Sequence, residues 1–126
     1  MKQLLLIASG GAAGSVARYL LSGWVLHHAA GWRFPLATFT INLTGCLIVG
    51  MLGALVVKHG FFSAETRLFL FTGIAGGFTT FSAFSLETFY LLRQGEIPIA
   101  AGYVLASVVA GLLALWLGFS MISDRF

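Results

Sequence analysis

Charged side chains are scarce in this chain of 126 residues. Asp, Glu, Lys and Arg together make up 9% of the sequence, whereas a typical soluble domain has about 25%. So few charges cannot cover a surface that faces water, which excludes a soluble globular domain. Clusters of basic residues with interleaved aromatic residues are also missing, so nucleic acid is not an expected partner.

Cysteine is rare, with a single residue, and the common catalytic motifs are missing. The single cysteine, Cys46, cannot form an internal disulfide. The sequence has no HExxH motif, no Cys/His ligand cluster and no nucleotide-binding loop. Glu87 is the only acidic residue inside an apolar segment, and a membrane enzyme would need a pair of acids. We therefore expect a protein that is not an enzyme.

Long apolar runs occupy most of the sequence. A helix of about 20 apolar residues spans the hydrocarbon core of a bilayer. Four such segments are predicted, at about 4–28, 34–57, 65–92 and 97–122. The sequence therefore predicts an all-α membrane protein with four transmembrane helices, in which residues 1–126 form a single transmembrane domain.

Short loops between the four spans place both termini and the middle loop on one side of the membrane. The basic residues are divided four to two between the sides: Lys2, Lys58, Arg67 and Arg125 against Arg33 and Arg93. This bias is weak by the positive-inside rule, so either the termini face the cytoplasm or the chain inserts in both orientations. Polar residues on every span would face lipid unless a second subunit covered them. We therefore expect a homo-oligomer, most simply a dimer.

The third span contains a polar, glycine-rich stretch, Gly76-Gly77-Phe78-Thr79-Thr80-Phe81-Ser82. Each glycine weakens a helix by roughly 1 kcal/mol relative to alanine, and the Thr and Ser that follow compete for backbone hydrogen bonds. The pattern predicts that the third helix is broken near its middle, with a kinked packing helix as the alternative. Unwound backbone inside a membrane must be buried in protein or face water, and its carbonyls can coordinate a cation such as sodium.

Two further spans carry polar residues at mid-membrane depth. Arg18 lies about 13 Å along the first helix from His27, and a buried ionisable residue is a functional candidate. It either forms an ion pair with Glu87 or lines a wet vestibule that attracts anions. Asn42, one helical turn after Thr38, either makes an interhelical hydrogen bond or offers its amide donors to an anion.

The fourth span carries Tyr103, Ser107 and Gly111 at i, i+4 and i+8, which places them on one stripe of the helix. The two hydroxyls are hydrogen-bond donors, and the glycine leaves room beside them. The stripe is either a chance arrangement on an otherwise apolar helix or one wall of a polar pathway.

Phe81 and Phe84 are three residues apart in the third span and share a helix face. Ring edges are electropositive, so a small anion can rest against them while nearby donors complete its shell. Two phenylalanines at this spacing usually belong to a core. Beside Thr80 and Ser82, they are compatible with a polar seam that accepts anions.

The sequence resembles the Fluc (CrcB-like) family of bacterial fluoride ion channels over nearly its whole length. The resemblance rests on three segments that occur in order: GGAAGSVARY at 10–19, TFTINLTG at 38–45 and GIAGGFTTFSAFSLE at 73–87. It implies an antiparallel, dual-topology homodimer with two pores. It also implies passive export of fluoride across the bacterial inner membrane, which lowers cytoplasmic fluoride and its toxicity.

The resemblance further implies roles for individual residues. Those that look like part of the fluoride pore are the paired rings Phe81 and Phe84, the amide of Asn42, the fourth-span donors Tyr103 and Ser107, and the polar residues Thr38, Thr80, Ser82 and Glu87. Arg18 looks like the base of the vestibule. Gly111 falls where some members carry serine, so one donor is missing there or replaced by water.

A structural sodium ion is also implied by the resemblance. The backbone carbonyls of Gly76 and Thr79 match the family positions that hold it, two from each subunit at the dimer axis. The ion is expected to be held and not transported.

Two other functions compete with a channel. A small multidrug-type, proton-coupled transporter would need a carboxylate in its first span, where this chain has Arg18. A non-transporting membrane scaffold would account for the glycines but would leave the donors of Asn42 and Ser107 without a purpose.

Overall fold

The computed structural model describes residues 1–123, and every regular element within them is helical. Four helices are long and apolar enough to cross a membrane: Lys2–His28, Leu36–Lys58, Ala64–Arg93 and Ile97–Ser120. The prediction of an all-helical, multi-pass membrane protein with four spans is therefore confirmed. Arg125, which contributed to the expected charge bias, lies outside the described residues.

Three spans are continuous α-helices, and the third is built from shorter pieces. The continuous helices are α1 (Lys2–His28), α2 (Leu36–His59) and α6 (Ile97–Ser120). The pieces of the third span are α3 (Ala64–Arg67), the π-helix η1 (Leu68–Ala75), α4 (Gly76–Phe78) and α5 (Phe81–Arg93). The π-helical segment has no counterpart among the expectations from sequence.

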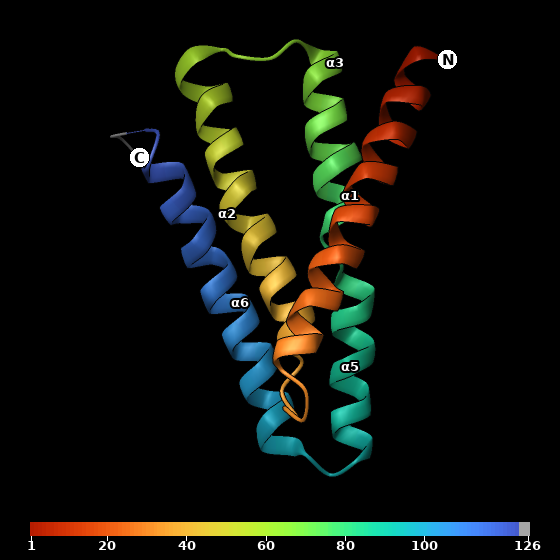
Figure 1. Cartoon of the computed structure of the whole chain (residues 1–126). Coiled ribbons are helices and arrows are strands. Elements are labelled where there is room, and N and C mark those ends of the chain that lie inside the picture. The colour runs from red at the N-terminus through yellow and green to blue at the C-terminus, as the bar shows by residue number, and fades with distance from the viewer. Residues whose placement is uncertain (124–126) are drawn as a thin grey trace.

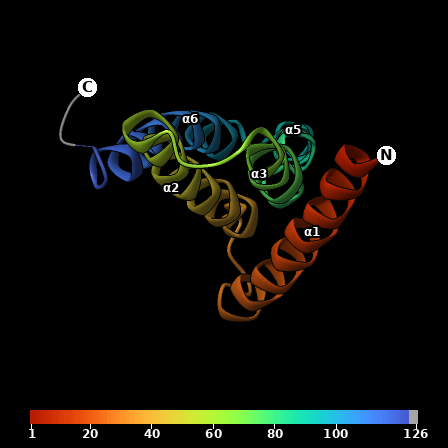
Figure 2. The ribbon, with the colours of Figure 1, turned by 90° about the horizontal axis from the view of Figure 1, so that it is seen from above.

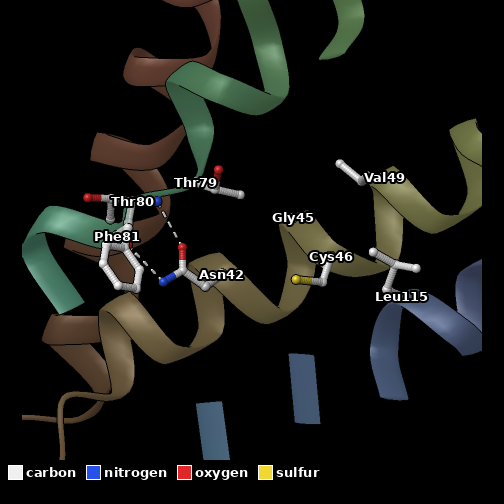
Figure 3. A pocket seen from close by; sticks show the side chains of 8 residues that line it. All are labelled: Asn42, Gly45, Cys46, Val49, Thr79, Thr80, Phe81 and Leu115. Atoms are coloured by element: carbon white, nitrogen blue, oxygen red, sulfur yellow. Dashed lines mark hydrogen bonds between the residues drawn. The ribbon is translucent and has the colours of Figure 1, made fainter. Parts of the chain in front are cut away.

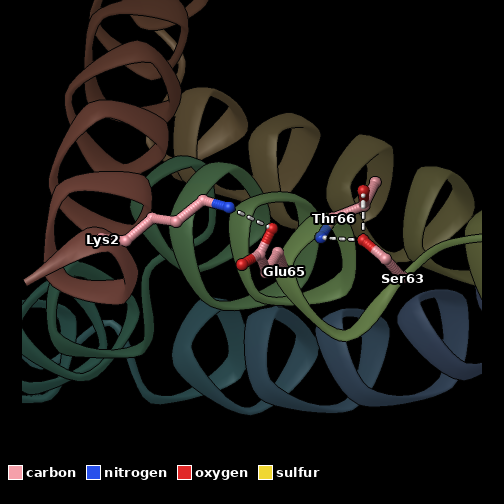
Figure 4. Close-up of polar contacts among 4 residues, drawn as sticks. All are labelled: Lys2, Ser63, Glu65 and Thr66. Carbon is pink, nitrogen blue, oxygen red and sulfur yellow. Dashed lines mark hydrogen bonds and ion pairs between the residues drawn. The ribbon is translucent and has the colours of Figure 1, made fainter.

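The third span begins at a capped helix end. The Ser63 hydroxyl oxygen accepts a hydrogen bond from the Thr66 N–H at 3.2 Å, which satisfies one of the free donors of the first turn (Figure 4). Lys2 at the start of α1 pairs with Glu65 at 2.8 Å across the same end of the molecule. At the opposite end, Arg33 pairs with Glu96 between the two loops. Ion pairs thus join neighbouring segments at both ends of the bundle.

The spans alternate in direction, so the N-terminus, the α2–α3 loop and the end of α6 lie at one end of the molecule (Figure 1). α6 packs along α2, while α1 packs against η1 and α4 (Figure 2). The third span therefore has α1 along its first half, and α6 contacts its second half, α5. The interruption of this span lies between the two halves.

Close backbone contacts hold both helix pairs together. A Cβ atom on Gly14 would lie 2.2 Å from the Ile74 carbonyl oxygen, and one on Gly50 would lie 2.1 Å from that of Leu115. Distances this short can be accommodated only by glycine. Small residues therefore let these membrane helices approach within backbone contact.

The interruption of the third span falls at Thr79 and Thr80. Thr79 has ψ 159°, and Thr80 has φ −149° and ψ 119°, so both are extended. Gly76 remains helical, with φ −63° and ψ −36°. The expected break is therefore present, but it begins after the glycines and not at Gly76. Gly77 stays helical because it packs against the backbone of Gly11, where a Cβ would lie 2.5 Å from the carbonyl oxygen.

Candidate functional site

The amide of Asn42 replaces the backbone hydrogen bonds that the third span loses at its interruption. Asn42 Oδ1 accepts a hydrogen bond from the Thr80 N–H at 2.9 Å, and Nδ2 donates to the Thr80 carbonyl at 3.0 Å (Figure 3). The interhelical bond proposed for Asn42 from sequence is therefore present. An amide nitrogen carries two hydrogens, so one donor remains beyond this pair.

The two threonines of the interruption also use their hydroxyls locally. The Thr80 hydroxyl accepts from the Ala83 N–H at 3.3 Å and so caps α5. The Thr79 hydroxyl donates to the Ala75 carbonyl at 2.9 Å. The side chains of the extended segment are thus hydrogen-bonded to the helix before it and to the helix after it.

Backbone carbonyls are released where the helix stops. In a continuous helix the Gly76 carbonyl would accept from the Thr80 N–H, which instead bonds to Asn42. For this carbonyl no donor is found among the described residues, and Gly76 is exposed. The Thr79 carbonyl faces the Arg18 guanidinium at 3.5 Å, so it already lies beside a positive charge. Of the two carbonyls expected from sequence to hold a cation, that of Gly76 has no donor within residues 1–123, whereas that of Thr79 already accepts from Arg18.

Glu87 lies between two hydroxyl groups. Thr38 donates to Glu87 Oε1 at 2.7 Å, and Tyr103 donates to Oε2 at 2.8 Å. Both donors are buried, with 5% exposure for Thr38 and 0% for Tyr103. Within residues 1–123 no ion pair joins Glu87 to Arg18, which corrects the alternative considered from sequence. The carboxylate accepts from two neutral hydroxyls, whereas the Arg18 guanidinium lines the same pocket and donates to the Thr79 carbonyl.

Phe81 and Phe84 lie side by side, as their spacing indicates. Their ring centroids are 5.6 Å apart at an interplanar angle of 40°. Their surroundings differ, because the Phe84 ring packs against Tyr103, with centroids 5.1 Å apart and a tilt of 54°, whereas Phe81 is 79% exposed. Phe84 belongs to the small core around Tyr103, and Phe81 projects from the chain.

Two pockets flank the interruption. One, of about 300 Å³, lies between α2, α6 and the extended segment, and its lining includes Asn42, Cys46, Thr79, Thr80, Phe81 and Leu115 (Figure 3). The other, of about 510 Å³, lies toward α1, and its lining includes Ser15, Arg18, Thr38, Thr80, Ser82 and Glu87. Thr80 lines both. Most of the polar residues expected from sequence therefore lie around the interruption, whereas Tyr103 and Ser107 line neither pocket.

The three residues of the α6 stripe, Tyr103, Ser107 and Gly111, have different surroundings. Tyr103 reaches Glu87, whereas the Ser107 hydroxyl is buried without a hydrogen-bond partner among the described residues. Gly111 faces α2, and a Cβ on it would lie 3.6 Å from Cys46 Sγ. Ser107 lines neither of the two pockets, so the structure does not bring it together with the others.

Some residues at the pockets were not expected from sequence. Ser15 and Ser22 line the larger pocket beside Arg18, at i−3 and i+4 from it, which is one helix face. That spacing was available in the sequence. Cys46 and Gly45 line the smaller pocket, but neither residue type carries a signal for such a role.

Four apolar helices, with pockets that contain polar side chains on both sides of an interrupted span, define an integral membrane protein with a polar seam beside that interruption. A model of the family described as "CrcB-like protein, Camphor Resistance (CrcB)" matches residues 5–119, so the chain belongs to this CrcB-like family.

Curated relatives match nearly the full length of the chain. The fluoride-specific ion channel FluC of Methylobacillus flagellatus is 57% identical over 122 residues, which cover 97% of this chain and 95% of the relative. The protein of the same name from Agrobacterium fabrum is 43% identical over 126 residues, covering 100% of both chains. That from Rhizobium meliloti is 42% identical over 121 residues, covering 96% of each.

Proposed function

We propose that this protein is a fluoride-selective ion channel that lets fluoride leave the cytoplasm passively across the bacterial inner membrane. Family membership supports a channel and not an enzyme, because the relatives named above are fluoride-specific ion channels. The observation that carries the proposal is the pair of pockets that share Thr80 as a lining residue at the interruption of the third span. Hydrogen-bond donors at this depth serve a solute that must shed water.

The chemistry of the seam favours a small anion. Arg18 contributes positive charge to the larger pocket, and Ser82 and Thr80 contribute hydroxyls. The second amide hydrogen of Asn42 and the ring edges of Phe81 add electropositive groups at the smaller pocket. Further pore residues in this proposal are Phe84, Thr38, Glu87, Tyr103 and Ser107.

A second, antiparallel copy of the chain completes the pore in this proposal. Phe81 and Ser82 are exposed beside the interruption, and Gly76 is exposed with a free carbonyl. Polar backbone at mid-membrane depth cannot face lipid, because each unsatisfied group costs several kcal/mol. The weak charge bias between the two sides is compatible with insertion in both orientations.

In this proposal the carbonyl oxygens of Gly76 and Thr79 coordinate a sodium ion at the dimer axis. Two carbonyls from each copy supply four hard oxygen ligands, the type that alkali cations prefer. The bound ion would neutralise these oxygens and join the two copies. The ion is held in place and takes no part in conduction.

The small multidrug-type transporter is not favoured. Its proton exchange requires a free carboxylate in the first span, where this chain has Arg18. Glu87, in the third span, accepts hydrogen bonds from the hydroxyls of Thr38 and Tyr103. A scaffold without transport would have no use for the pockets at Thr80.

Fluoride efflux from vesicles tests the proposal. Proteoliposomes loaded with potassium fluoride receive valinomycin, and an electrode records external fluoride. We expect rapid fluoride efflux, and little chloride efflux from matched vesicles loaded with potassium chloride. Efflux no faster than from protein-free vesicles, or equal passage of chloride, would overturn the proposal.

A further inference from the structure

We propose that Asn42 and Gly45 form a template on α2 that fixes the shape of the Thr79–Thr80 interruption, so that both act as positioning residues for conduction. The inference rests on the proposed channel function. It concerns two residues of α2 that hold the backbone of the third span in its extended conformation. Asn42 and Gly45 are three positions apart and share one face of α2, which lies against the extended segment (Figure 3).

Asn42 fixes one residue of the interruption by both of its backbone groups. The N–H and the carbonyl of Thr80 are bonded to the same amide, at 2.9 and 3.0 Å. The N–H and the carbonyl belong to the two peptide units on either side of the Thr80 Cα, so neither unit can rotate without breaking a hydrogen bond. The orientation of Thr80, and of Phe81 directly after it, is therefore set from α2.

Gly45 fixes the preceding residue by shape. A Cβ on Gly45 would lie 2.3 Å from Thr79 Cγ2 and 3.4 Å from Phe78 Cδ1. The methyl group of Thr79 therefore fits in the notch that Gly45 leaves on α2. It cannot turn away freely, because the hydroxyl on the same Cβ is bonded to the Ala75 carbonyl at 2.9 Å. Added volume at Gly45 must displace the backbone of Thr79.

The contact of Gly45 differs from that of the packing glycines. Gly50 and Gly118 face backbone carbonyls of the neighbouring helix, at 2.1 Å from the position of a Cβ. Gly45 instead faces two side chains, the Thr79 methyl group at 2.3 Å from the position of a Cβ and the Phe78 ring at 3.4 Å, and only the methyl is too close. A clash with a methyl can be relieved by removing that methyl, whereas a clash with backbone cannot. This difference makes the template testable by a second substitution.

The test compares Gly45→Ala, Thr79→Ser and the double variant by fluoride efflux and by thermal unfolding in detergent. Serine lacks Cγ2 but keeps the hydroxyl that bonds to Ala75. We expect Gly45→Ala to slow efflux by about tenfold or more and to lower the unfolding temperature. In the double variant we expect both values to return close to those of Thr79→Ser alone.

Two matched variants separate the template from general packing. Gly53→Ala is on the same helix, and its Cβ would meet only Phe119 Cδ2 at 3.9 Å, so efflux and unfolding should stay at wild-type values. Gly50→Ala should be damaging, and Thr79→Ser should not rescue it. Asn42→Ala should slow efflux, and Thr79→Ser should not rescue that variant either.

Each outcome decides the proposal. Wild-type behaviour of Gly45→Ala, or failure of Thr79→Ser to rescue it, would overturn the template. If Gly45→Ala does not fold, recovery of a folded double variant supports the template and continued misfolding rejects it. The unfolding temperatures do not depend on fluoride transport, so a wild-type protein without fluoride efflux would defeat the proposed function separately.

Discussion

Tyr103 and Glu87 come from neighbouring spans and are joined by a hydrogen bond of 2.8 Å from the phenol to the carboxylate. Tyr103 is fully buried and belongs to the core formed with Leu91 and Ala100. The phenol thus connects the packed end of the bundle to the polar pocket that Glu87 lines. Its removal would leave one carboxylate oxygen without a donor.

The first prediction concerns this hydrogen bond. Tyr103→Phe should reduce the free energy of unfolding by about 1–3 kcal/mol, because the half-buried Glu87 carboxylate loses a hydrogen bond from a fully buried donor. Denaturant titration in detergent measures the loss. Tyr90→Phe is the control, since Tyr90 lies on an exposed part of α5 and its substitution should change stability by less than about 0.5 kcal/mol. Equal stability of the Tyr103 variant and wild type would contradict the assignment.

The paired phenylalanines should respond differently to the same substitution. Phe81→Ile and Phe84→Ile should each lower fluoride efflux by about tenfold, equivalent to a barrier higher by about 1.4 kcal/mol. Only Phe84→Ile should also reduce stability, by about 1–2 kcal/mol, because its ring packs against Tyr103. Efflux and unfolding are measured on the same preparations. Phe89→Ile, on an exposed face of α5, is the control. Unchanged efflux in both the Phe81 and the Phe84 variant would argue against these two rings as part of the fluoride pathway.

Arg18 should act through its charge. Arg18→Gln should slow efflux most at low ionic strength, and the difference from wild type should shrink as salt rises, because salt screens exposed charge over about 10 Å at 0.1 M. Arg18→Lys should retain more activity than Arg18→Gln. The control Arg93→Gln removes an exposed charge at the end of α5. A defect independent of salt would indicate a structural role for Arg18.

Removal of sodium tests the carbonyl site. Exchange of sodium for a large organic cation during purification should shift the protein from dimer toward monomer, because facing carbonyls lose the charge that joins them. Size-exclusion chromatography with light scattering measures the change. Return of sodium should restore the dimer, and the total salt concentration stays constant as the control. An unchanged dimer would count against Gly76 and Thr79 as ligands.

Gly111 should accept a larger side chain. A Cβ there would lie 3.6 Å from Cys46 Sγ, an ordinary contact, so Gly111→Ser should fold normally and should maintain or increase fluoride efflux by adding a donor. Gly118→Ser is the matched control on the same helix. Its Cβ would lie 2.1 Å from the Leu47 carbonyl, so this variant should be destabilised. Similar unfolding temperatures for the two variants would contradict the packing of α2 against α6.

The four spans could be predicted from sequence because each is a long run of residues that only lipid can solvate. The position of the interruption could not. Helix propensity favours a break at Gly76 and Gly77, but Gly77 packs against the backbone of α1, and both glycines remain helical. The helix ends at Phe78, and Asn42 offers an alternative partner to the backbone of Thr80. Such a partner lies far away in the chain, and no local pattern reveals it.

The sequence predicted most of the polar residues around the interruption but not which partners they bind. Depth in the membrane singled out Arg18, Asn42 and Glu87, since unpaired polar groups are costly there. Their partners depend on how the helices are rotated against each other. The pairing of Glu87 with two hydroxyls, and not with Arg18, follows from that rotation. Nothing in the sequence indicates the contact of Gly45 with Thr79, because the space beside a glycine has a role only when the neighbouring side chain is known.

The interruption of the third span has a consequence for how the chain enters the bilayer. α5 has 13 residues and a length of about 20 Å, less than the roughly 30 Å of the hydrocarbon core. It cannot cross alone, and the extended residues before it carry unsatisfied backbone groups until Asn42 binds Thr80. α2 precedes the third span in order of synthesis, so Asn42 leaves the ribosome before Thr80 does.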